Sequence, residues 1–182
     1  MYLDVGVGAA FSGIVGLSLT SSLNWQHKQN LVTARIAGVL SVTETAAELA
    51  PFIAFPFFRD AGHMTEASLM DGWRTVKGGH SFSLSAGISY GSLSIPYYYP
   101  NSNRLAETLR YKYAGIPFEA NVLWFKPRRE RYHIYQIFPV GRPTAFGHSY
   151  GFKISGNISS HSYASFGVIL GWGFHRNYAN AL

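Results

Sequence analysis

The stretch VGLSLTSSLNWQ, residues 15–26, separates apolar from polar side chains by parity. Its odd positions carry one polar residue, Ser21, and are otherwise apolar: Val15, Leu17, Leu19, Leu23 and Trp25. Its even positions carry only Gly, Ser, Thr, Asn and Gln. Successive side chains of a β-strand point to opposite faces, so this pattern predicts a strand with one apolar and one polar face. The stretch is also longer than the usual strand of a soluble domain, which runs about 5–6 residues. A wall of such long, two-faced strands is therefore expected.

The same alternation returns along the chain and predicts seven further strands. They are expected at residues 2–9, 31–43, 47–57, 81–95, 109–125, 146–157 and 162–174. Two long polar connections are expected between them, at residues 59–79 and 126–145. The first has a helical turn predicted at 65–70, and the second has room for an extra short strand at 132–138. The sequence thus predicts an all-β fold in a single domain, residues 1–182.

The composition favours a membrane location for these strands. Charged residues make up 13% of the chain, against roughly 25% in soluble domains. The mean hydropathy is nevertheless close to zero, as expected when polar and apolar residues alternate on a barrel wall. No window approaches the ~18 uninterrupted apolar residues of a spanning helix. We therefore expect an eight-stranded antiparallel up-and-down (meander) transmembrane β-barrel.

Backbone polar groups left unpaired in hydrocarbon are costly, so a sheet crosses a membrane only as a closed barrel. Eight strands suffice for the smallest barrels, whose interiors are filled by side chains, so no open pore is expected. The alternative is a soluble lipocalin-like barrel with reversed faces, which would bind a small apolar ligand between Val15, Leu17, Phe82 and Leu84. Its water-facing side would carry Ser, Gly, Thr and Asn with few charges, whereas soluble surfaces carry roughly 25–35% charged residues. The lipid-exposed arrangement is favoured.

Three groups of residues are candidates for special roles. Charged residues on the polar faces are expected to pair in the lumen as buried charges must: Asp4, Arg35, Glu48, Glu119 and Lys153. Aromatic residues near strand ends suit a girdle at the lipid–water boundary: Trp25, Tyr90, Trp124 and Trp172. Basic residues in one connection are candidates for contacts with lipid phosphates: Lys126, Arg128, Arg129 and Arg131.

Other chemistry is not favoured by the sequence. There is no Cys, which removes disulfides and thiol-ligated metals. The histidines near predicted strand ends lack carboxylate partners at metal-ligand spacing, so neither a metal nor another cofactor is expected. His161 and Ser162 are adjacent, which places their side chains on opposite faces of a strand, and no acid lies nearby to complete a triad. We expect no enzyme activity, and a net charge of +6 without a recognised motif argues against nucleic-acid binding.

Three stretches resemble strands of a known family. Residues 79–90, GHSFSLSAGISY, are similar to its "FSLSAGISY" strand, residues 114–120, AGIPFEA, to its "IGIPLEAQ" strand, and residues 30–35, NLVTAR, to its "NLFTLR" strand. These are small outer-membrane β-barrels common in Bacteroidetes. The resemblance implies an eight-stranded, porin-like barrel in the cell envelope, with no activity assigned for most members. The expected partners are the lipid bilayer, lipopolysaccharide and the outer-membrane assembly machinery.

An outer-membrane location requires an export signal. Residues 1–4, MYLD, form neither a basic n-region nor the start of an apolar h-region. The expectation is that an export signal preceded this chain and has been removed.

Overall fold

A computed structural model describes the backbone of residues 1–12, 15–50, 53–98, 105–125, 130–134, 138–144 and 146–174. Side chains are described for residues 1–12, 16–41, 62–98, 106–125 and 147–174. All regular structure in these ranges is β. The strands are β1 (Tyr2–Phe11), β2 (Val15–His27), β3 (Asn30–Ala50), β4 (Ile53–Lys77), β5 (His80–Tyr98), β6 (Leu105–Phe125), β7 (Glu130–Ile134), β8 (Phe138–Thr144), β9 (Phe146–Ser159) and β10 (Tyr163–Phe174).

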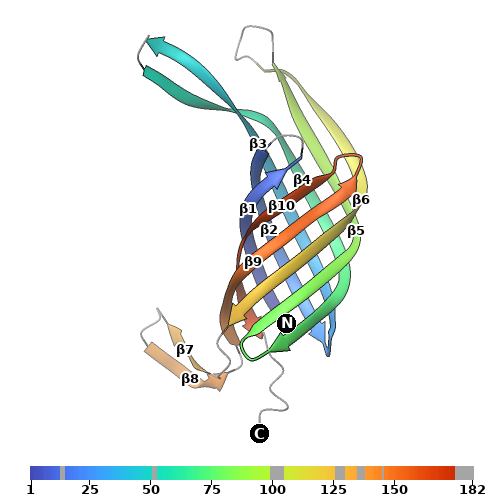
Figure 1. The fold of residues 1–182 in the computed structure, drawn as a ribbon, viewed down its shortest axis with the longest axis vertical. Coiled ribbons are helices and arrows are strands. Elements are labelled where there is room, and N and C mark those ends of the chain that lie inside the picture. Colours follow the sequence, from blue (N-terminus) through green and yellow to red (C-terminus); the bar gives the residue numbers. More distant parts are fainter. Residues whose placement is uncertain are drawn as a thin grey trace.

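Eight of the described strands close into one barrel, in the order β1-β10-β9-β6-β5-β4-β3-β2. Every neighbouring pair is antiparallel, and β1 closes the ring by pairing with β10 from Tyr2 opposite Gly173 to Phe11 opposite Ala164. Within the closed ring each strand is paired on both sides, which is the requirement for a sheet in hydrocarbon. Above Gly115, β6 pairs only with β5. The predicted eight-stranded antiparallel barrel is confirmed (Figure 1).

The two ends of the barrel differ. The N-terminus and the end of β10 lie at the end drawn at the bottom of Figure 1, which we call the lower end. There β2 joins β3 and β4 joins β5 through two-residue turns, with Lys28 at φ 57°, Gly78 at φ 64° and Gly79 at φ 121°. Positive φ at these positions suits the tight hairpins of twisted strands. At the upper end, β3 and β4 continue as a paired ribbon beyond the barrel.

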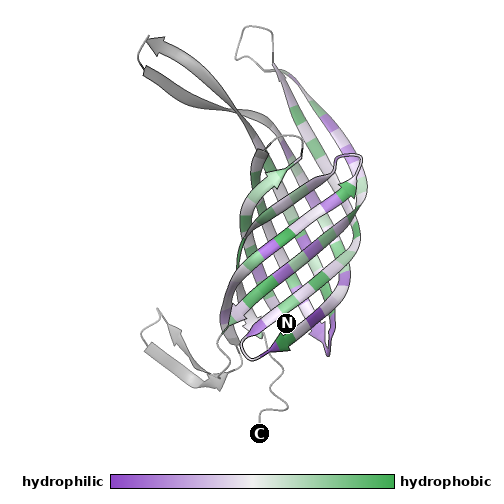
Figure 2. Ribbon diagram, viewed as in Figure 1, coloured by the Kyte–Doolittle hydropathy of each residue, from purple (hydrophilic) through white to green (hydrophobic). Residues whose placement is uncertain are grey.

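The apolar faces of the strands point outward. Leu19 is 47% exposed, Ile88 72% and Val168 50%, although each sits in the middle of a strand. The alternate positions are occupied by buried polar residues, such as Ser18, Thr20 and Ser89. Figure 2 shows the resulting alternation of hydrophobic and hydrophilic residues along the coloured parts of the barrel strands. Residues proposed to line a cavity in the soluble alternative, Leu17, Phe82 and Leu84, are exposed on the outside, so that alternative is wrong.

We define the apolar belt as the outward-facing apolar side chains in the middle of the eight barrel strands. It includes Val5, Val7, Leu19, Ile36, Leu69, Ile88, Ile116, Phe152 and Val168. Within the described residues, no helix is long and apolar enough to cross a membrane.

The predicted fourth strand was wrong. It was expected at residues 47–57, followed by a polar connection over 59–79 with a helical turn at 65–70. In the structure, β4 runs from Ile53 to Lys77, and residues 62–77 form its part of the barrel wall. Residues 47–50 belong to β3 instead. The alternation was missed because Met64 and Met70 face inward while Asp71 faces outward, the reverse of the pattern elsewhere.

The other long connection also contains strands, but they are not in the barrel. Within residues 126–145, β7 and β8 pair only with each other as a two-stranded sheet. The expected short strand at 132–138 overlaps the end of β7 and the first residue of β8, and residues 135–137 lie outside the described residues.

Candidate functional site

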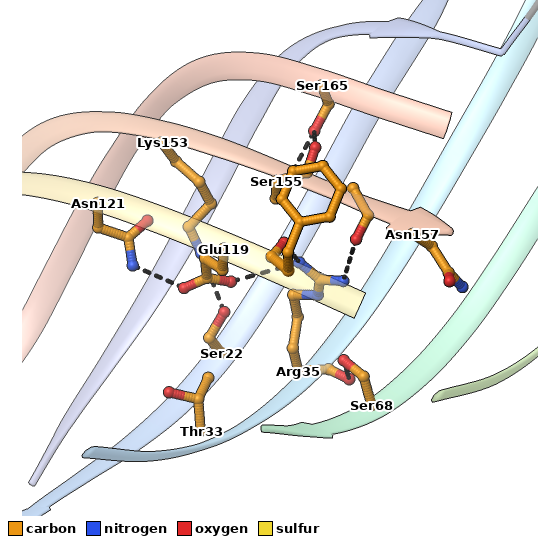
Figure 3. Close-up of polar contacts among 12 residues, drawn as sticks. Ser22, Thr33, Arg35, Ser68, Glu119, Asn121, Lys153, Ser155, Asn157 and Ser165 are labelled. Atoms are coloured by element: carbon orange, nitrogen blue, oxygen red, sulfur yellow. Dashed lines mark hydrogen bonds and ion pairs between the residues drawn. The ribbon is translucent and has the colours of Figure 1, made fainter. Parts of the chain in front are cut away.

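The middle of the barrel interior holds a network of buried charged side chains. Lys153 on β9 lies 2.7 Å from Asp4 Oδ1 on β1 and 3.3 Å from Glu119 Oε2 on β6. Arg35 on β3 lies 3.5 Å from the same Glu119 oxygen and 2.9 Å from Glu66 Oε1 on β4. One chain of ion pairs therefore connects five strands across the lumen. Figure 3 shows Lys153 and Arg35 converging on Glu119.

Amide and hydroxyl groups complete this ionic network. Asn24 Nδ2 donates to Asp4 Oδ2 at 2.5 Å, and Asn121 Nδ2 donates to Glu119 Oε1 at 2.6 Å. Asn157 Nδ2 donates to Glu66 Oε2 at 2.5 Å, so each of the three carboxylates has an amide partner. Lys153 Nζ also donates to Ser22 Oγ at 3.0 Å. Charges this deep are retained only when they are paired and hydrogen-bonded, and this network meets both conditions.

A second interior cation lies nearer the lower end. Arg74 on β4 is fully buried, and its guanidinium donates to Gln26 Oε1 and Ser81 Oγ, both at 3.0 Å. Its Cζ lies 4.4 Å from the centre of the Tyr2 ring, in the geometry of a cation–π contact. Arg74 thereby joins β2, β4, β5 and β1 across the lower part of the lumen.

Apolar side chains pack above and below the ionic network. One cluster comprises Ala10, Val39, Met64, Tyr113 and Tyr163, and the other comprises Tyr2, Leu31, Leu123 and Ile169. On β3, Arg35 lies between Leu31 of the lower cluster and Val39 of the upper one, and Glu119 lies between Leu123 and Tyr113 on β6. Both Arg35 and Glu119 are only 1% exposed. A cavity lined by Ser18, Thr20 and Lys153, among others, has room for about one water molecule. The described interior is packed.

The structure brings together four of the five charged residues proposed for the lumen: Asp4, Arg35, Glu119 and Lys153. The fifth, Glu48, pairs with Ala54 in the ribbon beyond the barrel, and its side chain lies outside the described residues. The third carboxylate of the network is Glu66. Neither Glu66 nor Arg74 was predicted from the sequence as a lumen residue. Both were assigned to a connection rather than a strand. One signal was available: Glu66 and Arg74 are eight residues apart and share the parity of Met70, so all three would face the same side of a strand.

The proposed girdle residues all face outward, but they do not form one ring. Trp25, Trp124 and Trp172 lie within two residues of the lower ends of their strands. Two other outward aromatics lie near this end, Trp73 and Tyr150, and the Tyr150 ring stacks on Trp124 at 6.2 Å. Tyr90 lies ten residues above the start of β5 and therefore belongs to the opposite side of the apolar belt.

The remaining candidate positions are only partly described. Lys126, Arg128 and Arg129 lie outside the described residues, and Arg131 is in β7 with its side chain outside them. The His161 ring contacts those of Tyr111 and Tyr113, at 5.6 and 5.9 Å. His148 contacts Trp172. Among the described residues, no three His, Asp or Glu side chains gather as a metal site would require.

The fold matches those of solved outer-membrane barrels. Neisserial surface protein A aligns with a TM-score of 0.51 and 10% identity, covering 95% of this chain and 94% of that one. The attachment invasion locus protein Ail of Yersinia pestis, in complex with the heparin analogue sucrose octasulfate, aligns with a TM-score of 0.50 and 9% identity, covering 94% and 96%. No protein-family model and no curated protein matches the sequence. At these identities the likeness shows a shared fold, that of small eight-stranded outer-membrane barrels.

Proposed function

We propose that this protein is a non-enzymatic integral outer-membrane β-barrel that acts in adhesion, structure or interaction through the segments at its upper end. The observation that carries the proposal is the inverted distribution of polarity. Apolar side chains cover the outside of a closed barrel, while Asp4, Arg35, Glu66, Glu119 and Lys153 are buried inside it. Water would be a poor solvent for this exterior, whereas hydrocarbon suits it.

Packing of the interior supports a role without transport through the lumen. The ionic network crosses the middle of the barrel, and apolar clusters lie on either side of it. Eight-stranded barrels have interiors just wide enough for side chains to fill. The surfaces available to a partner are therefore the outer wall and the two ends.

The orientation follows from the connections. Outer-membrane barrels have short turns on the periplasmic side and long loops outside. The lower end carries the two-residue turns after His27 and Lys77, whereas the upper end carries the β3–β4 ribbon and the connection of residues 99–104. We infer that the upper end faces outside the cell. The insertion that holds β7 and β8 follows the lower end of β6 and is accordingly a long periplasmic segment.

Further assignments form part of the proposal. Residues 1–182 are one barrel domain, folded and inserted by the outer-membrane assembly machinery. Its type is that of the small Bacteroidetes barrels, which the three resembling stretches support. Lys126, Arg128, Arg129 and Arg131 follow the lower end of β6 in the sequence, and they are proposed to contact phospholipid phosphates of the inner leaflet, since Arg forks match phosphate oxygens.

The test is insertion into a bilayer. The purified chain, refolded into phosphatidylcholine vesicles, is expected to resist extraction by sodium carbonate and to migrate as a compact species in unheated SDS gels. A chain that remains monomeric and monodisperse without detergent, and that ignores the vesicles, would contradict the proposal.

A further inference from the structure

Five polar side chains form a patch on the outer wall near the upper end, which we call the upper basic patch. It consists of His63 and Thr65 on β4, Ser92 on β5, and Arg110 and Lys112 on β6. By strand parity these residues lie on the same face as Leu69, Ile88 and Ile116 of the apolar belt. Of the residues of opposite parity beside them, Met64 and Tyr113 are buried in the lumen, whereas Tyr111, between Arg110 and Lys112, is 43% exposed. The patch therefore faces away from the lumen.

The pairing of the three strands makes the patch continuous. Thr65, Ser92 and Lys112 are opposite one another in one row, and in the row above His63 and Arg110 flank Ser94, which is buried. Thr65 Oγ1 lies 3.0 Å from Ser92 Oγ, beside Lys112. Directly opposed side chains on a sheet are separated by about 5 Å at Cβ, and same-face neighbours along a strand by about 6.8 Å. The patch thus covers roughly 10 by 7 Å, which suits one or two phosphate groups.

The patch begins where the apolar belt ends. The row below it is Ala67, Tyr90 and Ala114, and the next row is Leu69, Ile88 and Ile116. Tyrosine is enriched at the lipid–water boundary because one end of its ring is polar. Tyr90 is outward and exposed, so it places that boundary one row below Lys112. Figure 2 shows hydrophilic residues gathered on the upper part of β6.

The charge of the patch is not neutralised by the described side chains. Neither Arg110 nor Lys112 makes an ion pair with a carboxylate among them. Glu66 has the opposite parity on β4, and its carboxylate binds Arg35 and Asn157 inside the lumen. Two cations, an imidazole and hydroxyl donors therefore face the headgroup region together, without the counter-charges that the interior cations have.

We propose that the upper basic patch binds the phosphate groups of lipopolysaccharide in the outer leaflet. The assignment rests on the proposed outer-membrane location and adds a partner and a site to it. Arg and Lys next to hydroxyl donors form charge-assisted hydrogen bonds with phosphate oxygens. Phosphate monoesters carry about −1.5 to −2 charges at neutral pH, more than the single charge of a phospholipid diester, and three strands bring enough donors for such a group. The site differs from the basic run at 126–131, which follows the lower end of β6 in the sequence.

The test compares lipid binding by matched variants. Wild-type protein is reconstituted in phosphatidylcholine nanodiscs containing either lipid A or phosphatidylglycerol at equal total charge, and retained lipid is titrated by native mass spectrometry. R110Q/K112Q is the test variant. K28Q/K77Q, which removes two exposed charges at the lower end, is the control. The single variant K112Q is included because it disturbs the strand least.

Loss of the two cations is expected to weaken lipid A binding about 10- to 30-fold, since each Lys or Arg near a membrane surface contributes a few-fold to tenfold in affinity. K112Q should lose an intermediate amount, K28Q/K77Q less than twofold, and phosphatidylglycerol binding should change about threefold or less. Unchanged lipid A binding by an inserted R110Q/K112Q protein would overturn the site. So would an equal loss for phosphatidylglycerol, which would indicate a general charge effect. Failure of the wild type to insert at all would instead overturn the proposed function, and the site with it.

Discussion

Arg35 Nη2 lies 2.9 Å from Glu66 Oε1, and both side chains are almost completely excluded from solvent. The two residues come from adjacent strands, with Arg35 opposite Ser68 and Glu66 opposite Ala37. Asn157 on the far side of the lumen donates to the other Glu66 oxygen. This ion pair thereby connects the β3–β4 wall to β9 through the barrel interior.

Removing the carboxylate of this pair should be strongly destabilising. Glu66→Ala leaves the buried Arg35 guanidinium without its nearest counter-charge, and breaking one partner of a buried pair costs about 3–5 kcal/mol. The exposed Glu107 is the matched control, and Glu107→Ala should change the free energy of unfolding by less than about 0.5 kcal/mol. Urea unfolding in lipid vesicles measures both. Equal unfolding free energies for the two variants would contradict a structural role for the pair.

A charged residue on the outer wall should lower the free energy of unfolding more when it lies deeper in the bilayer. Leu19 is in the middle of β2 and Leu3 is at the lower end of β1. Leu19→Arg should cost about 2–4 kcal/mol near the bilayer midplane, and Leu3→Arg about 0–1 kcal/mol near the boundary. The same unfolding measurement in vesicles tests this. Equal stability of both variants and the wild type would contradict the proposal that lipid surrounds the apolar belt.

Inward-facing glycines allow close approach of neighbouring strands at specific points. A Cβ on Gly87 would meet the backbone carbonyl oxygen of Leu69 on β4 and would lie 2.7 Å from Met70 Cα, whereas a Cβ on Gly147 would meet nothing within 4 Å. Gly87→Ala should therefore destabilise the barrel by about 1–3 kcal/mol through overpacking. Gly147→Ala is the control and should change stability by less than about 0.5 kcal/mol. A neutral Gly87→Ala would show that β4 and β5 separate easily, contrary to this account.

The packed interior predicts an absence of ion conduction. In planar bilayers, the wild-type barrel should show no sustained current steps, because Arg35, Glu119 and Lys153 meet across the lumen. A 16-stranded porin, which encloses an aqueous channel, is the positive control. Regular openings of the wild-type protein would mean that the ionic network leaves a continuous water path.

Much of the barrel could be predicted from parity alone. In strands such as β2 and β5, almost every outward residue is apolar and almost every inward residue is small and polar. The face to which each side chain points followed from this, because a shift by one residue would exchange the two faces. The same reasoning assigned Asp4, Arg35, Glu119 and Lys153 to the lumen, and the structure buries all four side chains.

Strand β4 shows where parity fails. An inward side chain can be apolar where its neighbours in the lumen are apolar too. Met64 faces inward for this reason and packs with Val39 and Tyr113 in the upper cluster. Asp71 is tolerated outside because it lies near Trp73, toward the lower end of β4. These exceptions hid the strand, and with it Glu66 and Arg74. The upper basic patch was hidden too, because it requires the register between β4, β5 and β6.

The most direct test uses the absence of cysteine from the sequence. A nitroxide attached to Ile88→Cys reports whether that outward position contacts lipid or water, with Lys28→Cys in the lower turn as the aqueous reference. In bilayers, we expect the spin relaxation of a nitroxide at position 88 to be accelerated mainly by oxygen, which dissolves in lipid. At position 28 it should be accelerated mainly by a water-soluble nickel chelate. If the nickel chelate also dominated at position 88, the apolar belt would face water, and the membrane assignment would be wrong.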